Sequence, residues 1–219
     1  MSQARDRILN AVRLGRAKQA PPAPSLKVGR QALLPPRFVR DTPDLVALFL
    51  SKLEAVSATH VVLPDLAAVP DHLAAWLAAR TLPVDFILAA EPRLSAIDWA
   101  SAGLRPALRA PEVLAPATIV SGAFAGVAET GSVALVTSGQ SRPSHNLLAD
   151  SHIVIIERAQ ILPAIEDVWR AAARGGLPRS LAFITGPSRT ADIEMSMELG
   201  VHGAVRLHVI VIGRTTTGA

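Results

Sequence analysis

One stretch of the C-terminal half carries several groups suited to hold a carboxylate or a phosphate: Gly186, Pro187, Ser188, Arg189 and Thr190. Backbone N–H groups at the start of a helix, together with two hydroxyls and one guanidinium, could bind such an anion. The alternative is structural. Ser188 and Thr190 would then only cap a helix, and the guanidinium would pair with a following carboxylate, Asp192 or Glu194. The residues leave both interpretations open.

A carboxylate with a different potential role lies at Glu129, between two apolar stretches and directly before Thr130 and Gly131. If it is partly buried, it could act as a general base or as a nucleophile. The alternative is a structural glutamate whose oxygens accept backbone N–H groups or pair with an arginine.

Four histidines stand in the C-terminal half: His145, His152, His202 and His208. None has the i,i+4 helical spacing of a zinc motif, and we expect no metal site. His208 lies between two apolar residues, which favours a core or edge position. His202 is the better functional candidate, as a hydrogen-bond donor to an anionic ligand or as an acid or base. His152 begins a strand and could face the same end of the sheet.

A polar loop over residues 138–144 carries Arg142, a second candidate contact for an anion. The chain has no Gly-x-Gly-x-x-Gly after a strand, no Walker-type loop and no Gly-x-Ser-x-Gly. The sequence therefore argues against a Rossmann dinucleotide site, a P-loop and a hydrolase nucleophile elbow.

The elements that must position these groups follow from the hydrophobic pattern. The apolar run 181–184 predicts a buried parallel strand, and residues 188–200 predict a helix with Met195 and Leu199 on one face and Gly200 as its stop. Further strands are predicted over 59–63, 84–88, 117–120, 132–137, 152–156 and 207–212. Helices are predicted over 2–18, from a cap at Thr42 or Asp44 to residue 56, over 65–80 and over 162–174. This alternation indicates an α/β fold, which we expect to be three-layered, with a mostly parallel sheet and helices on both faces.

Charge separates an N-terminal arm from the body. Residues 1–40 hold nine Lys or Arg and one acid, a net charge of +8, so the overall +4 leaves −4 for the rest. We expect two parts, a basic helix with a proline-rich linker over residues 1–43 and a single α/β domain over 44–219. The arm fits docking to an acidic protein or a solvated tail. It offers little to nucleic acid, because no aromatic residue precedes Phe38.

Cysteine is absent from the 219 residues, which excludes disulfides, zinc–thiolate sites and cysteine-ligated iron–sulfur clusters in them. No apolar run reaches the ~20 residues that a membrane-spanning helix needs, and the N-terminus lacks an apolar signal core. We therefore expect no membrane span and a cytoplasmic location.

The segments from Gly186 to Glu194, from Leu199 to Gly203 and from Leu207 to Val209 resemble the signature of the lactate-utilisation protein C family, or LUD domain. Ala128-Glu129-Thr130-Gly131-Ser132 and His152-Ile153-Val154 are similar to two further segments of that family. The resemblance runs from about Leu45 to Gly213, and it departs from the family at Ala204, where a proline is usual.

The resemblance implies a fold shared with ribose-5-phosphate isomerases, CoA transferases and formyltetrahydrofolate cycloligases. It also implies a subunit or accessory protein of an L-lactate-oxidising system. In that system the stretch Gly186–Thr190 would bind a small carboxylate or phosphate ligand. The resemblance also implies iron–sulfur partner proteins. Because this chain lacks cysteine and shows no cofactor motif, we expect no redox cofactor in it and expect the electron carriers on those partners. A homo-oligomer stays open.

Two alternatives remain. The first is a free-standing isomerase- or transferase-like enzyme acting on a phosphorylated or CoA-linked small acid, with Glu129 as its catalytic group by analogy with CoA transferases. The second is a non-catalytic interaction or regulatory protein.

Overall fold

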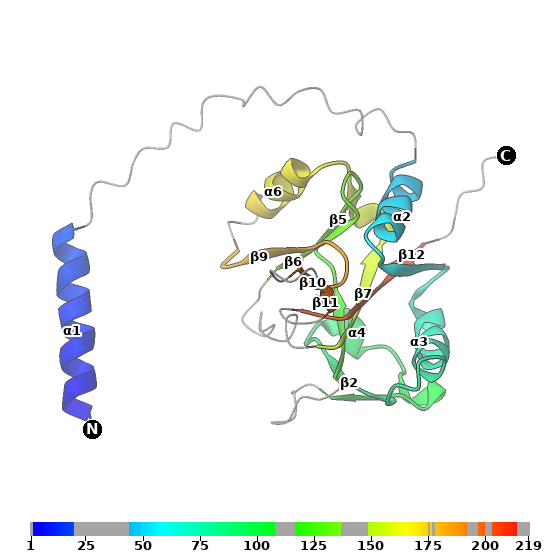
Figure 1. The fold of residues 1–219 in the computed structure, drawn as a ribbon, viewed down its shortest axis with the longest axis horizontal. Coiled ribbons are helices and arrows are strands. Elements are labelled where there is room, and N and C mark those ends of the chain that lie inside the picture. Colours follow the sequence, from blue (N-terminus) through cyan, green and yellow to red (C-terminus); the bar gives the residue numbers. More distant parts are fainter. Residues whose placement is uncertain are drawn as a thin grey trace. The chain divides into compact units, whose positions relative to one another are not determined.

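The structure is a computed structural model of the 219-residue chain, and it describes residues 2–19, 44–107, 117–136, 149–174, 176, 178–191, 197–199 and 203–213 (Figure 1). The chain divides into two units, Met1–Arg37 and Phe38–Ala219, and each is described by itself. The boundary that we expect after residue 43 lies outside the described residues.

The first unit contains the basic helix that the sequence predicts, α1, over Ser2–Gln19. Its described apolar side chains are exposed: Ile8, Leu9, Val12 and Leu14. Within the part of the chain that the structure describes, no helix is both long enough and apolar enough to cross a bilayer.

A six-stranded sheet forms the centre of the second unit, in the order β1-β12-β7-β4-β2-β3. Its strands are β1 (Thr59–Leu63), β2 (Asp85–Leu88), β3 (Arg105–Ala107), β4 (Thr118–Gly122), β7 (Ser151–Glu157) and β12 (Arg206–Ile212). Every pairing in this sheet is parallel. The mostly parallel α/β sheet expected from the sequence is confirmed.

One face of this sheet packs against a helical layer. The layer contains η2 (Leu66–Ala68), α3 (Val69–Ala78), α4 (Pro92–Ser95) and η3 (Ala100–Ala102). Alternate residues of the central strands, such as Ile153 and Ile155, meet Leu73 and Trp76 of α3 in one buried cluster. This alternation follows from the two-residue period of a strand.

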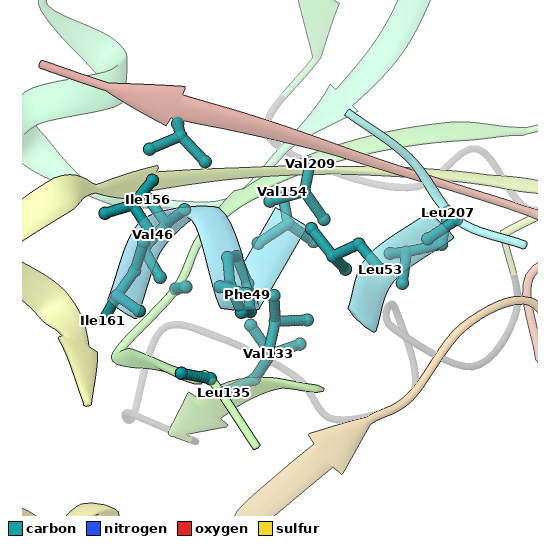
Figure 2. Close-up of a cluster of buried hydrophobic side chains, with 14 residues drawn as sticks. Val46, Phe49, Leu53, Val133, Leu135, Val154, Ile156, Ile161, Leu207 and Val209 are labelled. Atoms are coloured by element: carbon teal, nitrogen blue, oxygen red, sulfur yellow. The ribbon is translucent and has the colours of Figure 1, made fainter. Parts of the chain in front are cut away.

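The opposite face of the sheet packs against α2 (Leu45–Ala55), which the carboxylate of Asp44 caps by accepting from the N–H groups of Val46 and Ala47. Phe49 and Leu53 of α2 are fully buried. In Figure 2 these side chains lie between the two long central strands and a further strand that carries Val133.

A second, four-stranded sheet shares this layer, in the order β8-β5-β6-β9. Its strands are β5 (Ala125–Val127), β6 (Ser132–Val136), β8 (Ile161–Leu162) and β9 (Leu181–Ile184). Its other face packs against α6 (Ile165–Ala173) through a cluster that includes Val127, Ala134 and Val168. The short 3-10 helix η4 (Arg158–Gln160) leads from β7 into β8.

Two predictions about residues 181–200 are wrong. The run Leu181–Ile184 forms a strand, but β9 is a half-exposed strand that pairs antiparallel with β6, not a buried parallel strand. The predicted helix over 188–200 is replaced by an antiparallel pair, β10 (Arg189–Ala191) and β11 (Met197–Leu199). The helical spacing of two apolar residues favours a helix, but the two ends of the segment pair with each other as strands. Strand pairing therefore outweighs the local helix propensity.

Candidate functional site

Two glycine turns of the family-like segments meet the last turn of α2. Gly131 (φ +68°) and Gly186 (φ +79°) both adopt a left-handed conformation. A Cβ on Gly131 would lie 2.6 Å from the backbone nitrogen of Leu53, and one on Gly186 would lie 2.5 Å from the carbonyl oxygen of Val56. Both turns therefore need glycine, for backbone angle and for close approach.

A chain of three hydroxyls joins the two segments. The Oγ atoms of Thr130 and Ser132 are 2.7 Å apart, and Ser132 Oγ is 2.6 Å from Thr185 Oγ1. Ser132 is buried, whereas Thr185 is exposed. Each hydroxyl can donate one proton, so two internal bonds leave one proton of the chain for a further acceptor.

The side chain of Glu129 lies at the start of α6. Its Oε1 accepts a hydrogen bond from the backbone N–H of Ile165 at 3.3 Å, and its own N–H donates to the carbonyl of Pro163. A carboxylate at this end of a helix is favoured by the helix dipole. The position matches the structural alternative for this residue, and its catalytic role stays a prediction.

The anion site expected at a helix start does not form in the described part of Gly186–Thr190. No helix begins there, the N–H of Ser188 donates to the carbonyl of Ala204 at 2.8 Å, and Arg189 and Thr190 belong to strand β10. Pro187 lies in the turn between β9 and β10. The described part of this segment therefore offers an anion no helix N-terminus.

His152 lies inside the sheet and contacts a serine that the sequence did not single out. Its Nε2 is 2.8 Å from Ser121 Oγ, and both side chains are buried. Burial lowers the pKa of His152 to about 4, so the ring is neutral at pH 7. Its Nδ1 has no hydrogen-bond partner among the described residues. Ser121 ends an apolar run, and no sequence signal distinguishes it.

Two histidines contact each other on the α3 face. The Nε2 atoms of His72 and His208 are 2.9 Å apart, and His208 Nδ1 is 2.8 Å from Thr59 Oγ1. Burial, followed by the charges of His72 and Arg80, lowers the pKa of His208 to about 3. The core position predicted for His208 is confirmed, and its partner His72 is a residue that the sequence reasoning missed.

Several predicted site residues lie outside the described residues: Arg142, His145, Asp192, Glu194 and His202. Of the remaining candidates, the structure brings the 129–132 turn and the Thr185–Gly186 turn together, and it places His152 with Ser121 instead. Among the described residues, no group of three His, Asp or Glu side chains could hold a metal ion.

The LUD domain family model matches residues 47–212. Among curated proteins, the chain is similar to lactate utilization protein C of Halalkalibacterium halodurans, with 38% identity over 91 residues that make up 39% of this chain and 40% of that protein. The protein of the same name from Deinococcus radiodurans is 33% identical over 122 residues, 52% of this chain and 58% of that one. The matched segments therefore span less than two thirds of these relatives.

A crystal structure of a DUF162 family protein from Deinococcus radiodurans has a similar fold. Its TM-score is 0.58 at 23% identity, and the match covers 81% of this chain and all of that one. At this identity the likeness concerns the fold alone.

Proposed function

This chain belongs to the LUD domain family, and from that premise we propose that it is a component of a lactate-utilisation system that binds a small anion and holds no redox cofactor of its own. The observation that carries the proposal is the family match over residues 47–212. The names of the curated relatives, lactate utilization protein C, support it.

The hydroxyl chain Thr130–Ser132–Thr185 is the proposed contact for the anion. It joins the two family-like segments, and Thr185 at its end is exposed. A carboxylate or phosphate oxygen would accept the remaining hydroxyl proton. Arg189 and Thr190 stay candidate ligand residues because they belong to the family-like segment from Gly186 to Glu194.

The redox step is assigned to partner subunits. Oxidation of lactate to pyruvate removes two electrons and two protons, and the 219 residues contain no cysteine to ligate an iron–sulfur cluster. The electrons would pass to clusters on iron–sulfur partners. The basic helix α1, with its exposed Ile8 and Val12, is a candidate docking element for such a partner.

Removal of this chain from its host tests the proposal. Cells lacking it should lose consumption of L-lactate and regain it when the wild-type chain is supplied, while growth on another carbon source stays normal. Consumption of L-lactate at the wild-type rate without the chain would contradict the proposal.

A further inference from the structure

A cavity of about 400 Å³ lies on the face of the six-stranded sheet that carries α3, between residues 66–70, which follow β1, and residues 93–101, which follow β2. Its apolar wall includes Leu66, Pro70 and Ile97, and its polar groups belong to Arg93, Asp98 and Ser101. This volume falls in the range of small-molecule sites. None of these residues belongs to the family-like segments discussed above.

The topology of the sheet favours a ligand at this edge. β2 and β4 are neighbours, but the chain leaves β2 toward the α3 face, where Leu94 and Trp99 are buried, and leaves β4 toward the opposite face, where Ala123 and Ala128 are buried. In open parallel sheets ligands bind outside the carboxyl ends of strands whose connections diverge in this way.

Side chains next to the cavity join the carboxyl ends of β2 and β4, where the connections that follow the two strands diverge. Glu91, which follows β2, accepts the N–H of Gly122, the last residue of β4, at 2.8 Å. Arg93 then reaches β7, where its Nη1 donates to Glu157 at 2.8 Å and its Nη2 to the carbonyl of Ile155 at 3.4 Å.

Arg93 keeps donors for a ligand. A guanidinium has five N–H groups, and its bonds to described residues use two of them. The carboxylate of Glu91 lies 3.9 Å from its Nε, which is beyond hydrogen-bond distance. A ligand carboxylate can therefore bind Arg93 while the bond to Glu157 stays in place.

Asp98 supplies the opposite charge in the same cavity. Its Oδ1 accepts the N–H of Ser101 at 3.2 Å, and its Oδ2 accepts no hydrogen bond from the described residues. The hydroxyl of Ser101 donates to the carbonyl of Asp98 at 2.7 Å, so its lone pairs remain available as acceptors. This part of the wall attracts a cationic donor.

We propose that this cavity binds an α-amino acid with an apolar side chain, its carboxylate on Arg93, its ammonium on Asp98 and its side chain against Leu66, Pro70 and Ile97. A hydroxy acid such as lactate would offer Asp98 only a neutral hydroxyl and would leave most of the apolar wall uncovered. The proposal does not rest on the lactate-utilisation role.

Isothermal titration calorimetry of the full chain tests the proposal with L-leucine and three analogues: 4-methylpentanoate, which lacks the ammonium, 3-methylbutylamine, which lacks the carboxylate, and L-lactate. L-leucine should bind, and each analogue should bind at least tenfold more weakly. Absence of L-leucine binding up to its solubility limit, or equal affinity for 4-methylpentanoate, would overturn the proposal.

Variants locate the site. Asp98→Asn should weaken L-leucine at least tenfold and leave 4-methylpentanoate unchanged, because asparagine can still cap Ser101 but carries no charge. Arg93→Gln should weaken both. The control is Asp85→Asn, which removes an exposed carboxylate paired with Arg105 and should change neither. Arg93→Gln also removes the bond from Arg93 to Glu157, and this loss could unfold the protein. In that case the test depends on Asp98→Asn, and an L-leucine affinity of Asp98→Asn equal to that of the wild type refutes the proposal.

Discussion

Oε1 of Glu129 accepts a hydrogen bond from the backbone N–H of Ile165, the first residue of α6, at 3.3 Å. The contact joins the turn between β5 and β6 to the helix that follows β8. β5 and β8 are parallel neighbours, so their ends, and the groups that follow them, lie together. The glutamate of the family-like segment thus has a definite structural partner.

We predict that Glu129→Ala lowers the free energy of unfolding by about 0.5–2 kcal/mol, the usual cost of removing a helix-capping acceptor. Glu129→Gln keeps an acceptor oxygen and should cost less than half as much. Urea unfolding monitored by circular dichroism measures both. Equal losses for the two variants would mean that the charge, and not the hydrogen bond, is what stabilises the helix start.

Gly131→Ala should destabilise the protein more than Gly103→Ala. Both glycines have φ near +70°, so each substitution carries the left-handed strain of about 1–2 kcal/mol. A Cβ at Gly103 meets nothing within 4 Å, whereas one at Gly131 meets the backbone of Lys52 and Leu53 at 2.6 Å. We expect a further loss of about 1–3 kcal/mol at Gly131 from overpacking, measured by urea unfolding. Similar losses at both positions would refute the close packing of this turn on α2.

Ser132→Ala should lower the free energy of unfolding by about 1–2 kcal/mol, because the substitution removes a buried hydroxyl bonded to Thr130 and Thr185. The matched control is Ser51→Ala, which removes an exposed hydroxyl of α2 and should stay within about 0.5 kcal/mol of the wild type. A Ser132 variant as stable as the control would show that the hydroxyl chain contributes nothing to stability.

Stability should fall on acidification below about pH 6.5, in part because of two buried histidines. An unfolded histidine titrates near pH 6.5, whereas the folded pKa is about 4 for His152 and about 3 for His208. Between these values the unfolded chain binds protons that the folded chain does not, so the free energy of unfolding decreases as the pH falls. Each histidine contributes a slope of up to about 1.4 kcal/mol per pH unit.

Urea unfolding of the wild type and of His152→Gln at several pH values between 7 and 4 measures this slope. The glutamine can still bond to Ser121 but does not titrate, so its curve should be the shallower one. Parallel curves for the two proteins would rule out a neutral buried His152 as a cause of the acid sensitivity.

The central sheet could be predicted from the sequence because its signals are local. The strands β1, β7 and β12 are short apolar runs, and Asp44 precedes the first apolar turn of α2, where it caps the helix. A parallel strand is buried on both faces and therefore requires a continuous apolar run. Such a run in the sequence predicts the strand directly.

The strand pairing of the second sheet and the antiparallel pair β10–β11 could not be predicted, because both depend on backbone pairing with another segment of the chain. Nothing in the run Leu181–Ile184 shows that its neighbour will be the antiparallel strand β6. The same holds for Ser132 and Thr185, which are 53 residues apart and lie together because β6 and β9 are paired. The sequence marks Ser132 as the last residue of the Ala-Glu-Thr-Gly-Ser segment, but it does not indicate the hydrogen bond between Ser132 and Thr185.

The most direct test of the proposed anion site is a thermal unfolding panel on the wild type, Thr185→Val and Thr185→Ser with L-lactate, pyruvate and phosphate. A ligand at about 100 times its dissociation constant stabilises by roughly 2.7 kcal/mol, which at about 2–4 °C per kcal/mol is a shift of several degrees. We predict that at least one of these anions raises the midpoint of the wild type and of Thr185→Ser, which keeps the hydroxyl, but not that of Thr185→Val. The same shift in all three proteins, or no shift with any anion, would contradict an anion site at the hydroxyl chain.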